Sequence, residues 1–157
     1  MTVWDIKTTP LFEGLNPAQV HNLIEIAHKD DYKKGRVICK YGEKTREVYV
    51  IIKGQVEAVS EAGISLGFLK EKEIFGEIGF AYGFERSATV VAREDSTLLA
   101  IDRSLLENLS KSDPAIKQVL MNNMVTSLSN KLIQANKKIE NLTIEIQKLK
   151  AMLNRTT

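Results

Sequence analysis

Cysteine and histidine are scarce in this chain of 157 residues, which contains one Cys and two His. The single thiol, Cys39, excludes an internal disulfide framework, and its place in an apolar run predicts a buried structural residue. The histidines, His21 and His28, lie near no cysteine or carboxylate cluster with the spacing of metal ligands, so no metal site is predicted. Because no Ser-His-Asp or Cys-His arrangement and no P-loop pattern is present, we do not expect an enzyme.

Long apolar runs and a dominant charge of one sign are missing as well. No apolar run approaches the ~18 residues that cross a bilayer, and the N-terminal MTVWDIKTTP lacks the layout of a secretory signal. A net charge of +2 does not by itself favour nucleic-acid binding. These absences predict a cytoplasmic protein that contacts no membrane and does not bind nucleic acid directly.

Between Asp31 and Asp102, short runs rich in Val, Ile and Tyr alternate with glycines. Many short strands of this kind predict an antiparallel β jelly roll or barrel. The dipeptide Lys53-Gly54 is a candidate two-residue hairpin turn. The expected strands are residues 36–40, 47–52, 55–60, 64–69, 87–92 and 97–101.

Helices are expected on both sides of this region, which makes the fold class mainly β with helices. Asn16 is a good N-cap and Pro17 suits the first helical position, so a helix is expected to begin there. Asp102 or Ser104 can cap a second, short helix that reaches Lys111.

The most informative segment is residues 75–90, which read FGEIGFAYGFERSATV and are expected to contain a short helix near residues 77–81. Arg86 offers a planar fork of N–H donors to phosphate oxygens, and exposed backbone N–H groups beside small residues form a concave nest for an anion. Glu77 accepts hydrogen bonds, so it would hold a hydroxyl and repel a second anion. These groups suit a small anion that also carries hydroxyls, such as a sugar phosphate. The alternative is that Glu77 and Arg86 merely pair with each other on the surface, which would contribute little.

This segment resembles the phosphate-binding cassette of the cyclic-nucleotide-binding domain family, and its FGEIGF…ERSATV form is similar to that of the catabolite-activator branch. The resemblance implies that Arg86 pairs with the cyclic phosphate of cyclic AMP or cyclic GMP, and that Glu77 binds the ribose 2′-hydroxyl. No further cofactor is implied. The segment departs from the family pattern at Glu85, where many members have Pro, and at Gly79, where many have Ala. The ligand-binding residues implied by the resemblance are Gly76, Glu77, Ile78, Arg86, Ser87 and Ala88.

The C-terminal region contains the second strong pattern. Asp113 is a candidate cap and Pro114 a candidate first residue of a long helix that no later Gly or Pro interrupts. Apolar residues then recur at alternating steps of four and three, a heptad repeat whose residue types favour a parallel two-stranded coiled coil. A single amphipathic helix folded on its own barrel is the alternative. The a positions are Val125, Leu132, Ile139, Ile146 and Leu153, and the d positions are Met121, Leu128, Ala135, Leu142 and Leu149.

These patterns divide the chain into a barrel domain, residues 1–111, and a dimerisation coiled coil, residues 112–157. The catabolite-activator branch normally continues into a helix-turn-helix, whereas this chain continues its heptads to Leu153. The resemblance to that branch also implies that the long helix closes over the bound base. The base-facing candidates by position are Ser127, Asn130, Lys131 and Gln134.

The predicted function is a dimeric cyclic-nucleotide sensor that signals through its C-terminal helix to an unknown partner protein. Two alternatives remain open: a dimeric scaffold of the same fold with a lost or changed ligand, and a transcription-regulator-like protein without its own DNA reader. A melting temperature that rises with cyclic AMP or cyclic GMP would separate the sensor from the scaffold. Salt-sensitive binding to random duplex DNA would indicate the regulator.

Overall fold

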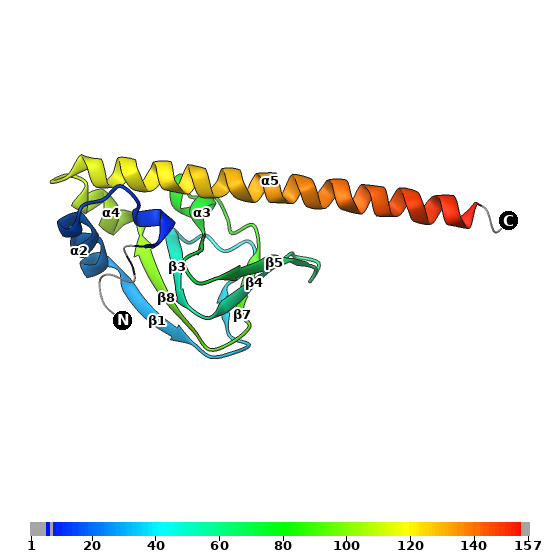
Figure 1. Ribbon diagram of the computed structural model, residues 1–157. Coiled ribbons are helices and arrows are strands. Elements are labelled where there is room, and N and C mark those ends of the chain that lie inside the picture. The colour runs from blue at the N-terminus through cyan, green and yellow to red at the C-terminus, as the bar shows by residue number, and fades with distance from the viewer. Residues whose placement is uncertain (1–5, 7, 155–157) are drawn as a thin grey trace. The chain divides into compact units, whose positions relative to one another are not determined.

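The computed structural model describes Ile6 and residues 8–154, and the chain forms two compact units, Met1–Met124 and Val125–Thr157. The first unit contains every strand found among these residues and the beginning of the long helix α5 (Figure 1). The strands are β1 (His28–Tyr32), β2 (Val37–Cys39), β3 (Glu47–Lys53), β4 (Gln55–Val59), β5 (Ser65–Lys70), β6 (Ile74–Phe75), β7 (Thr89–Ala92) and β8 (Ser96–Asp102). The helices are the 3-10 helix η1 (Pro10–Phe12), α2 (Pro17–Ile26), α3 (Glu77–Tyr82), α4 (Arg103–Leu109) and α5 (Pro114–Leu153).

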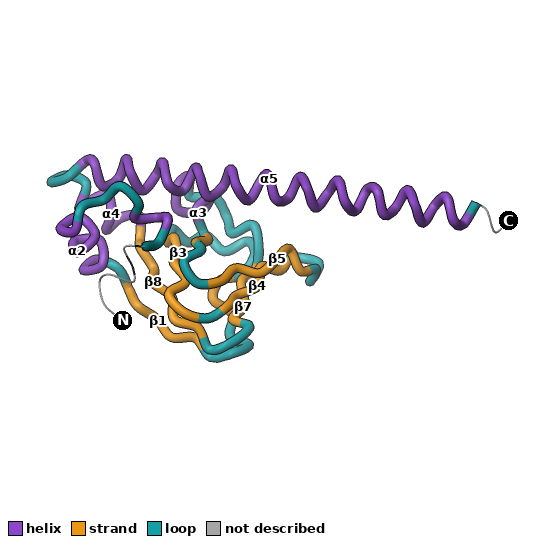
Figure 2. The backbone as a smooth tube through the Cα atoms, in the orientation of Figure 1, coloured by secondary structure: helices purple, strands orange, loops and turns teal. Residues whose placement is uncertain are grey.

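The strands form two four-stranded antiparallel sheets, with the orders β1-β8-β3-β6 and β2-β7-β4-β5 (Figure 2). Side chains from both sheets meet in one apolar core, in which Ile51, Val56 and Leu98 are at most 1% exposed. The predicted antiparallel β fold with helices is thereby confirmed. The buried members of this core are Cys39, Tyr49, Ile51, Val56, Phe75, Val90, Leu98 and Ala100.

A second core lies on the other face of β3 and β8 and is covered by helices. Val48 and Val50 belong to it, whereas Tyr49 and Ile51 of the same strand belong to the first core, as the alternation of side chains along a strand requires. We call this second cluster the helix-covered core. Its buried members are Leu11, Phe12, Val20, Leu23, Val48, Val50, Ile74, Phe80, Leu99, Ile101, Leu106, Ile116, Leu120 and Met124.

The helices begin at the residues that their capping chemistry predicts. The Asn16 side chain accepts a hydrogen bond from the Gln19 backbone N–H at 2.9 Å, and the Gln19 side chain accepts one from the Asn16 N–H at 3.0 Å. Asp102, and not Ser104, caps α4, because its Oδ1 accepts from the Ser104 N–H at 2.7 Å. The Oδ1 of Asp113 accepts from a first-turn N–H of α5 at 3.2 Å. Each cap satisfies donors that the helix itself leaves unpaired.

The prediction of a hairpin at Lys53-Gly54 is wrong. β3 pairs with β6 and β8, whereas β4 pairs with β5 and β7, so the turn carries the chain from one sheet to the other. Gly54 has a φ of +95°, and a Cβ at this position would lie 2.7 Å from the Cα of Ser96. Glycine is therefore required because the turn passes directly against β8.

Helix α5 carries apolar residues on two different faces. Ile116, Leu120 and Met124 are at most 1% exposed and belong to the helix-covered core of the first unit. The compact units therefore divide after Met124, later than the boundary expected between residues 111 and 112. From Val125 onward the helix belongs to the second unit. Among the residues described, no helix combines the length and the apolar character needed to pass through a bilayer.

Candidate ligand-binding site

The pairing of β6 with β3 fixes the start of the cassette. Phe75 lies opposite Tyr49 in the strand register, and the two rings stack with their centroids 4.8 Å apart. Gly76 then turns the chain with a φ of +90°, and α3 begins at the next residue. Phe80 is 1% exposed and anchors α3 in the helix-covered core. The short helix expected in this segment is thus confirmed, and its first residues are held beside β3.

Arg86 is the buried centre of this arrangement, with only 4% of its surface exposed. Its Nε donates to Oγ1 of Thr45 at 2.7 Å, its Nη2 donates to the carbonyl oxygen of Glu47 at 2.8 Å, and its Nη1 donates to that of Gly76 at 3.2 Å. The guanidinium carbon also lies 5.5 Å from the centre of the Tyr49 ring, within the range of a cation–π contact. These contacts clamp the guanidinium between the start of the cassette and the start of β3.

The partners of Arg86 in these short contacts are neutral oxygens. The ion pair that Arg86 forms with Glu47 is long, 3.5 Å from Nη2 to Oε2, and the Glu47 side chain is 33% exposed, so this pair neutralises the buried charge only weakly. The three short hydrogen bonds use three of the five N–H groups that a guanidinium carries. The clamp therefore orients a cation whose charge a bound anion would stabilise.

The other predicted ligand-binding residues differ in their exposure to solvent. Glu77 is 4% exposed at the first position of α3, whereas Ile78 is 40% exposed. Ser87 is exposed and Ala88 is half-buried. A hydrogen bond joins Arg86 to the carbonyl oxygen of Gly76.

Sequence reasoning missed three residues that hold Arg86. Glu47 and Tyr49 occupy alternate positions at the start of β3, so their side chains share one face of the strand, and Thr45 lies two residues before the strand. The alternation is visible in the sequence as Thr-Arg-Glu-Val-Tyr. Nothing in that pattern places it beside a segment about forty residues later, because the placement depends on the pairing of β3 with β6.

Burial changes the chemistry of the Tyr49 ring in this clamp. Loss of contact with water, with the Glu47 carboxylate adding to the effect, raises the pKa of the Tyr49 hydroxyl well above its usual value. Tyr49 is therefore neutral over the physiological range. Its ring faces the Arg86 guanidinium as a neutral aromatic surface and adds no negative charge that would compete with a bound anion.

Replacing Gly76 with alanine should destabilise the protein by more than a substitution at an open glycine. A Cβ at Gly76 would lie 2.6 Å from the carbonyl oxygen of Glu47 and closer still to Nη1 of Arg86, in addition to the strain of a positive φ. We expect a loss of about 2 kcal/mol or more in the free energy of unfolding, against about 1 kcal/mol for strain alone. Gly63→Ala is the matched control, because its φ is +77° and nothing lies within 4 Å of its added Cβ. If urea unfolding showed equal losses of unfolding free energy for Gly76→Ala and Gly63→Ala, the close approach at Gly76 would be contradicted.

Several residues that the sequence singled out lie outside the cassette. Ser127, Asn130, Lys131 and Gln134 lie on α5 in the second unit, whereas the cassette lies in the first, and their base-facing role stays a prediction. His21 lies 3.5 Å from Glu25 on an exposed face of α2. Within residue 6 and residues 8–154, no three His, Cys, Asp or Glu side chains are grouped so that they could hold a metal ion.

Comparison with known proteins decides the family. The family model described as Cyclic nucleotide-binding domain matches residues 29–113, which is more than half of the chain. The chain belongs to the cyclic nucleotide-binding domain family. The matched residues run from β1 to the cap of α5 and include the whole cassette. The resemblance inferred from the FGE and ERSATV segments is thereby confirmed.

Curated relatives share this domain within longer chains. Cyclic nucleotide-gated channel beta-3 from Mus musculus is 30% identical over 131 residues, which are 80% of this chain and 19% of the channel. Cyclic AMP receptor protein from Thermus thermophilus is 28% identical over 144 residues, which are 89% of this chain and 65% of that protein. The chain therefore spans about a fifth of the length of the channel and less than two thirds of the receptor protein.

Solved structures agree with this assignment. The Catabolite Activator Protein of Thermus thermophilus superimposes with a TM-score of 0.71 at 29% identity, covering 87% of this chain and 64% of that one. A cyclic nucleotide-binding domain from Methylobacillus flagellatus gives a TM-score of 0.79 at 17% identity, covering 88% of this chain and 80% of that one. The second likeness shows the fold alone.

Proposed function

We propose that this chain is a regulatory domain that binds a 3′,5′-cyclic purine mononucleotide in the cassette. The observation that carries the proposal is the buried Arg86 guanidinium, held by Thr45, Glu47 and Gly76 at the start of the cassette. In this proposal Arg86 binds the phosphate of the ligand and Glu77 accepts a hydrogen bond from its ribose 2′-hydroxyl. The backbone of Gly76, Ser87 and Ala88 completes the phosphate cradle.

The chemistry of these groups favours a cyclic over an open nucleotide. A cyclic phosphodiester carries one negative charge, which matches one guanidinium. A 5′-phosphate carries a charge of about −1.5 to −2 at neutral pH, and the excess would meet the carboxylates of Glu77 and Glu85. The names of two relatives, Cyclic AMP receptor protein and Cyclic nucleotide-gated channel beta-3, support a ligand of this class. They leave cyclic AMP and cyclic GMP as equal candidates.

We further propose that the chain acts as a parallel dimer through α5 and that its output is the state of this helix, which a partner protein reads. The heptad positions from Val125 to Leu153 support the dimer, because the large apolar side chains at these positions are 49–69% exposed in the single chain, apart from the half-buried Leu128. The ligand changes the output only if it favours one arrangement of α5 over another. A dimeric scaffold without a ligand is the rival function.

Binding should raise the stability of the protein in proportion to ligand excess. At a hundred times the dissociation constant, cyclic AMP or cyclic GMP should add about 2.7 kcal/mol to the free energy of unfolding, which a thermal melt records as a clear upward shift. 5′-AMP at the same concentration is the control and should shift the melt much less. A 2′-deoxy cyclic AMP tests Glu77, because a ligand without the hydroxyl should bind more weakly to the wild type. If neither cyclic nucleotide moves the melt at any concentration, the rival scaffold function is favoured.

A further inference from the structure

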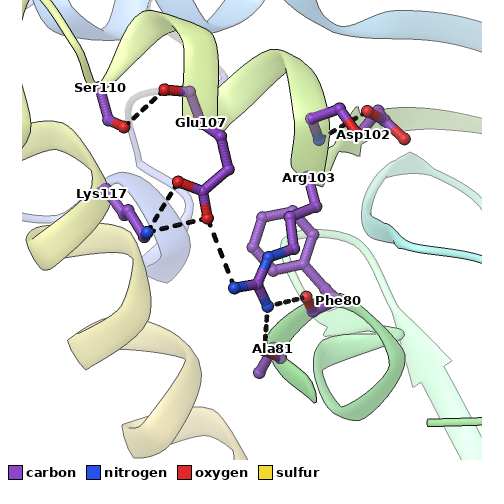
Figure 3. A network of polar contacts seen from close by, with 8 residues as sticks. Phe80, Ala81, Asp102, Arg103, Glu107, Ser110 and Lys117 are labelled. Atoms are coloured by element: carbon purple, nitrogen blue, oxygen red, sulfur yellow. Dashed lines mark hydrogen bonds and ion pairs between the residues drawn. The ribbon is translucent and has the colours of Figure 1, made fainter. Parts of the chain in front are cut away.

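Three charged side chains link the cassette helix to α4 and α5 (Figure 3). Arg103 opens α4, and its Nη1 donates to the carbonyl oxygen of Phe80 at 2.8 Å and to that of Ala81. Its Nη2 lies 3.4 Å from Oε1 of Glu107, one turn later in α4. Both carboxylate oxygens of Glu107 accept hydrogen bonds from Nζ of Lys117 on α5, each at 2.8 Å. We call Arg103, Glu107 and Lys117 the polar bridge.

The contact between Arg103 and α3 satisfies a local need of that helix. The last carbonyl groups of any helix lack partners within it, and a cation at this end also meets the negative end of the helix dipole. Phe80 and Ala81 stand in the final turn of α3, so the guanidinium supplies donors where they are missing. Arg103 is itself fixed, because its backbone N–H donates to the carbonyl oxygen of Arg46 at 3.1 Å. The C-terminal end of α3 is therefore held by one well-anchored side chain.

Glu107 is shared unequally between its two cationic neighbours. Lys117 makes two short contacts to it, whereas the contact with Arg103 is longer, at 3.4 Å. Hydrogen bonding from Lys117, with a smaller effect of Arg103, holds the pKa of Glu107 below its usual value, so the carboxylate is ionised at neutral pH. If Lys117 moved away, this carboxylate would turn to Arg103 and compete with the α3 carbonyls for the guanidinium. Lys117 thus keeps Arg103 available to α3.

We propose that Arg103 is a positioning residue for the ligand cassette, and that Lys117 keeps it on α3 by occupying Glu107. The readout through ligand affinity rests on the proposed function. The bridge couples the first turns of α5 to the cassette through charge, in addition to the apolar packing of Phe80, Ile116 and Leu120. Because coupling between sites is reciprocal, a ligand that needs an ordered α3 favours the contact between Lys117 and Glu107 by the same factor.

The test is a calorimetric titration with cyclic AMP and cyclic GMP of a set of variants with opposite expected signs. Arg103→Gln should weaken binding about tenfold, and Lys117→Met about two- to fivefold. Glu107→Gln should bind at least as tightly as the wild type, because a neutral amide does not draw Arg103 away from α3. The double variant of Lys117→Met and Glu107→Gln should lose the defect of Lys117→Met, and Lys117→Arg should restore wild-type affinity.

These signs separate positioning from a purely structural contribution. A bridge that only stabilised the fold would make Lys117→Met and Glu107→Gln alike in ligand affinity, and that result would overturn the proposal. Lys33→Met is the matched control, because it breaks an exposed ion pair of Lys33 with Asp95, at 2.6 Å, that involves neither α3 nor α4. It should leave affinity unchanged.

A second measurement keeps the bridge testable without a ligand. The backbone N–H groups of Phe80 and Gly83 donate to Gly76 and Gly79 at 3.0 and 2.9 Å, so their hydrogen exchange reports the opening of α3. Exchange at both should be faster in Arg103→Gln and Lys117→Met than in the wild type, Glu107→Gln or Lys33→Met. Unchanged exchange in Arg103→Gln and Lys117→Met would overturn the bridge. If the wild type bound neither cyclic AMP nor cyclic GMP, the proposed function would fail. Hydrogen exchange in α3 alone would then decide the role of Arg103.

Discussion

Arg86→Ala should lower the affinity for cyclic nucleotide by roughly ten- to a hundredfold, because a charge-assisted hydrogen bond to phosphate contributes about 1.5–3 kcal/mol. The same change should also destabilise the unliganded protein. The Thr45 hydroxyl and the carbonyl group of Glu47 would lose the Arg86 donors, whereas the Gly76 carbonyl would keep the backbone N–H of Phe80. A buried polar group without a partner costs about 1–3 kcal/mol. Calorimetric titration measures the first effect, and urea unfolding without ligand measures the second.

Arg93→Ala separates these two effects. Arg93 pairs with Glu57, which is 7% exposed, so its removal takes the cationic partner from a buried carboxylate that keeps a hydrogen bond with Ser65. Arg93 lies outside the cassette, directly after β7, and its loss should reduce stability while affinity is unchanged. Equal affinities of the Arg86→Ala and Arg93→Ala variants would exclude Arg86 from the ligand site. Arg86→Lys should be intermediate, since one ammonium group keeps the charge but cannot reach three acceptors at once.

The cassette and the helix caps could be predicted from the sequence because their determinants are local. Gly76 is needed where φ is +90°, and Asn16 and Asp102 cap the helices that follow them within three residues. Such positions depend on the backbone conformation of their own segment. The family resemblance extended this local information to a fold that the sheets confirm.

Contacts between distant segments could not be predicted in the same way. Two partners of Arg86, Thr45 and Glu47, lie just before and at the start of β3, and the partners of Arg103 come from α3 and from Glu107 of α4. Strand β1, which reads His-Lys-Asp-Asp-Tyr, carries almost no strand signal, because it is an edge strand whose residues are mostly exposed. Its pairing with the apolar β8 decides its conformation. The turn at Gly54 was predicted, but the sheet that the next strand joins was not. A hairpin with β3 and a crossing to the other sheet both require the same glycine, so the glycine does not distinguish them.

The heptad pattern of α5 was only partly informative for a related reason. A periodic apolar face predicts that something covers it but does not say what. Ile116 and Leu120 are covered by the chain's own core, and the d residue Met121 packs against that core in part. Ile116 and Leu120 stand outside the a and d positions, and from Val125 to Leu153 the large heptad side chains are exposed, apart from the half-buried Leu128. The boundary between these two uses of one helix falls at Met124, where the first compact unit ends.

The exposed stripe of α5 leads to the second large expected effect, the loss of dimerisation in Ile139→Asp. Helices outside a folded core are marginal in water unless a partner covers their apolar face. Apart from the half-buried Leu128, the large heptad side chains of the second unit are well exposed, and Ile139 stands near the middle of this exposed stripe at 62%. In a parallel pair, the carboxylate that this substitution introduces in one chain would face its copy in the other, so two carboxylates would be buried together. We expect a cost of about 3 kcal/mol or more, which weakens dimerisation by roughly a hundredfold.

Sedimentation equilibrium measures this effect directly. The wild type should sediment with twice the 17.6 kDa mass of one chain, and Ile139→Asp should shift toward a single chain at the same concentration. Asn141→Asp is the matched control, because it places the same new charge two residues away on an exposed position that is neither a nor d. The control should remain dimeric. A wild type that sediments as one chain at all concentrations would contradict the coiled coil. A dimer that Ile139→Asp leaves intact would place the interface on another surface of the molecule.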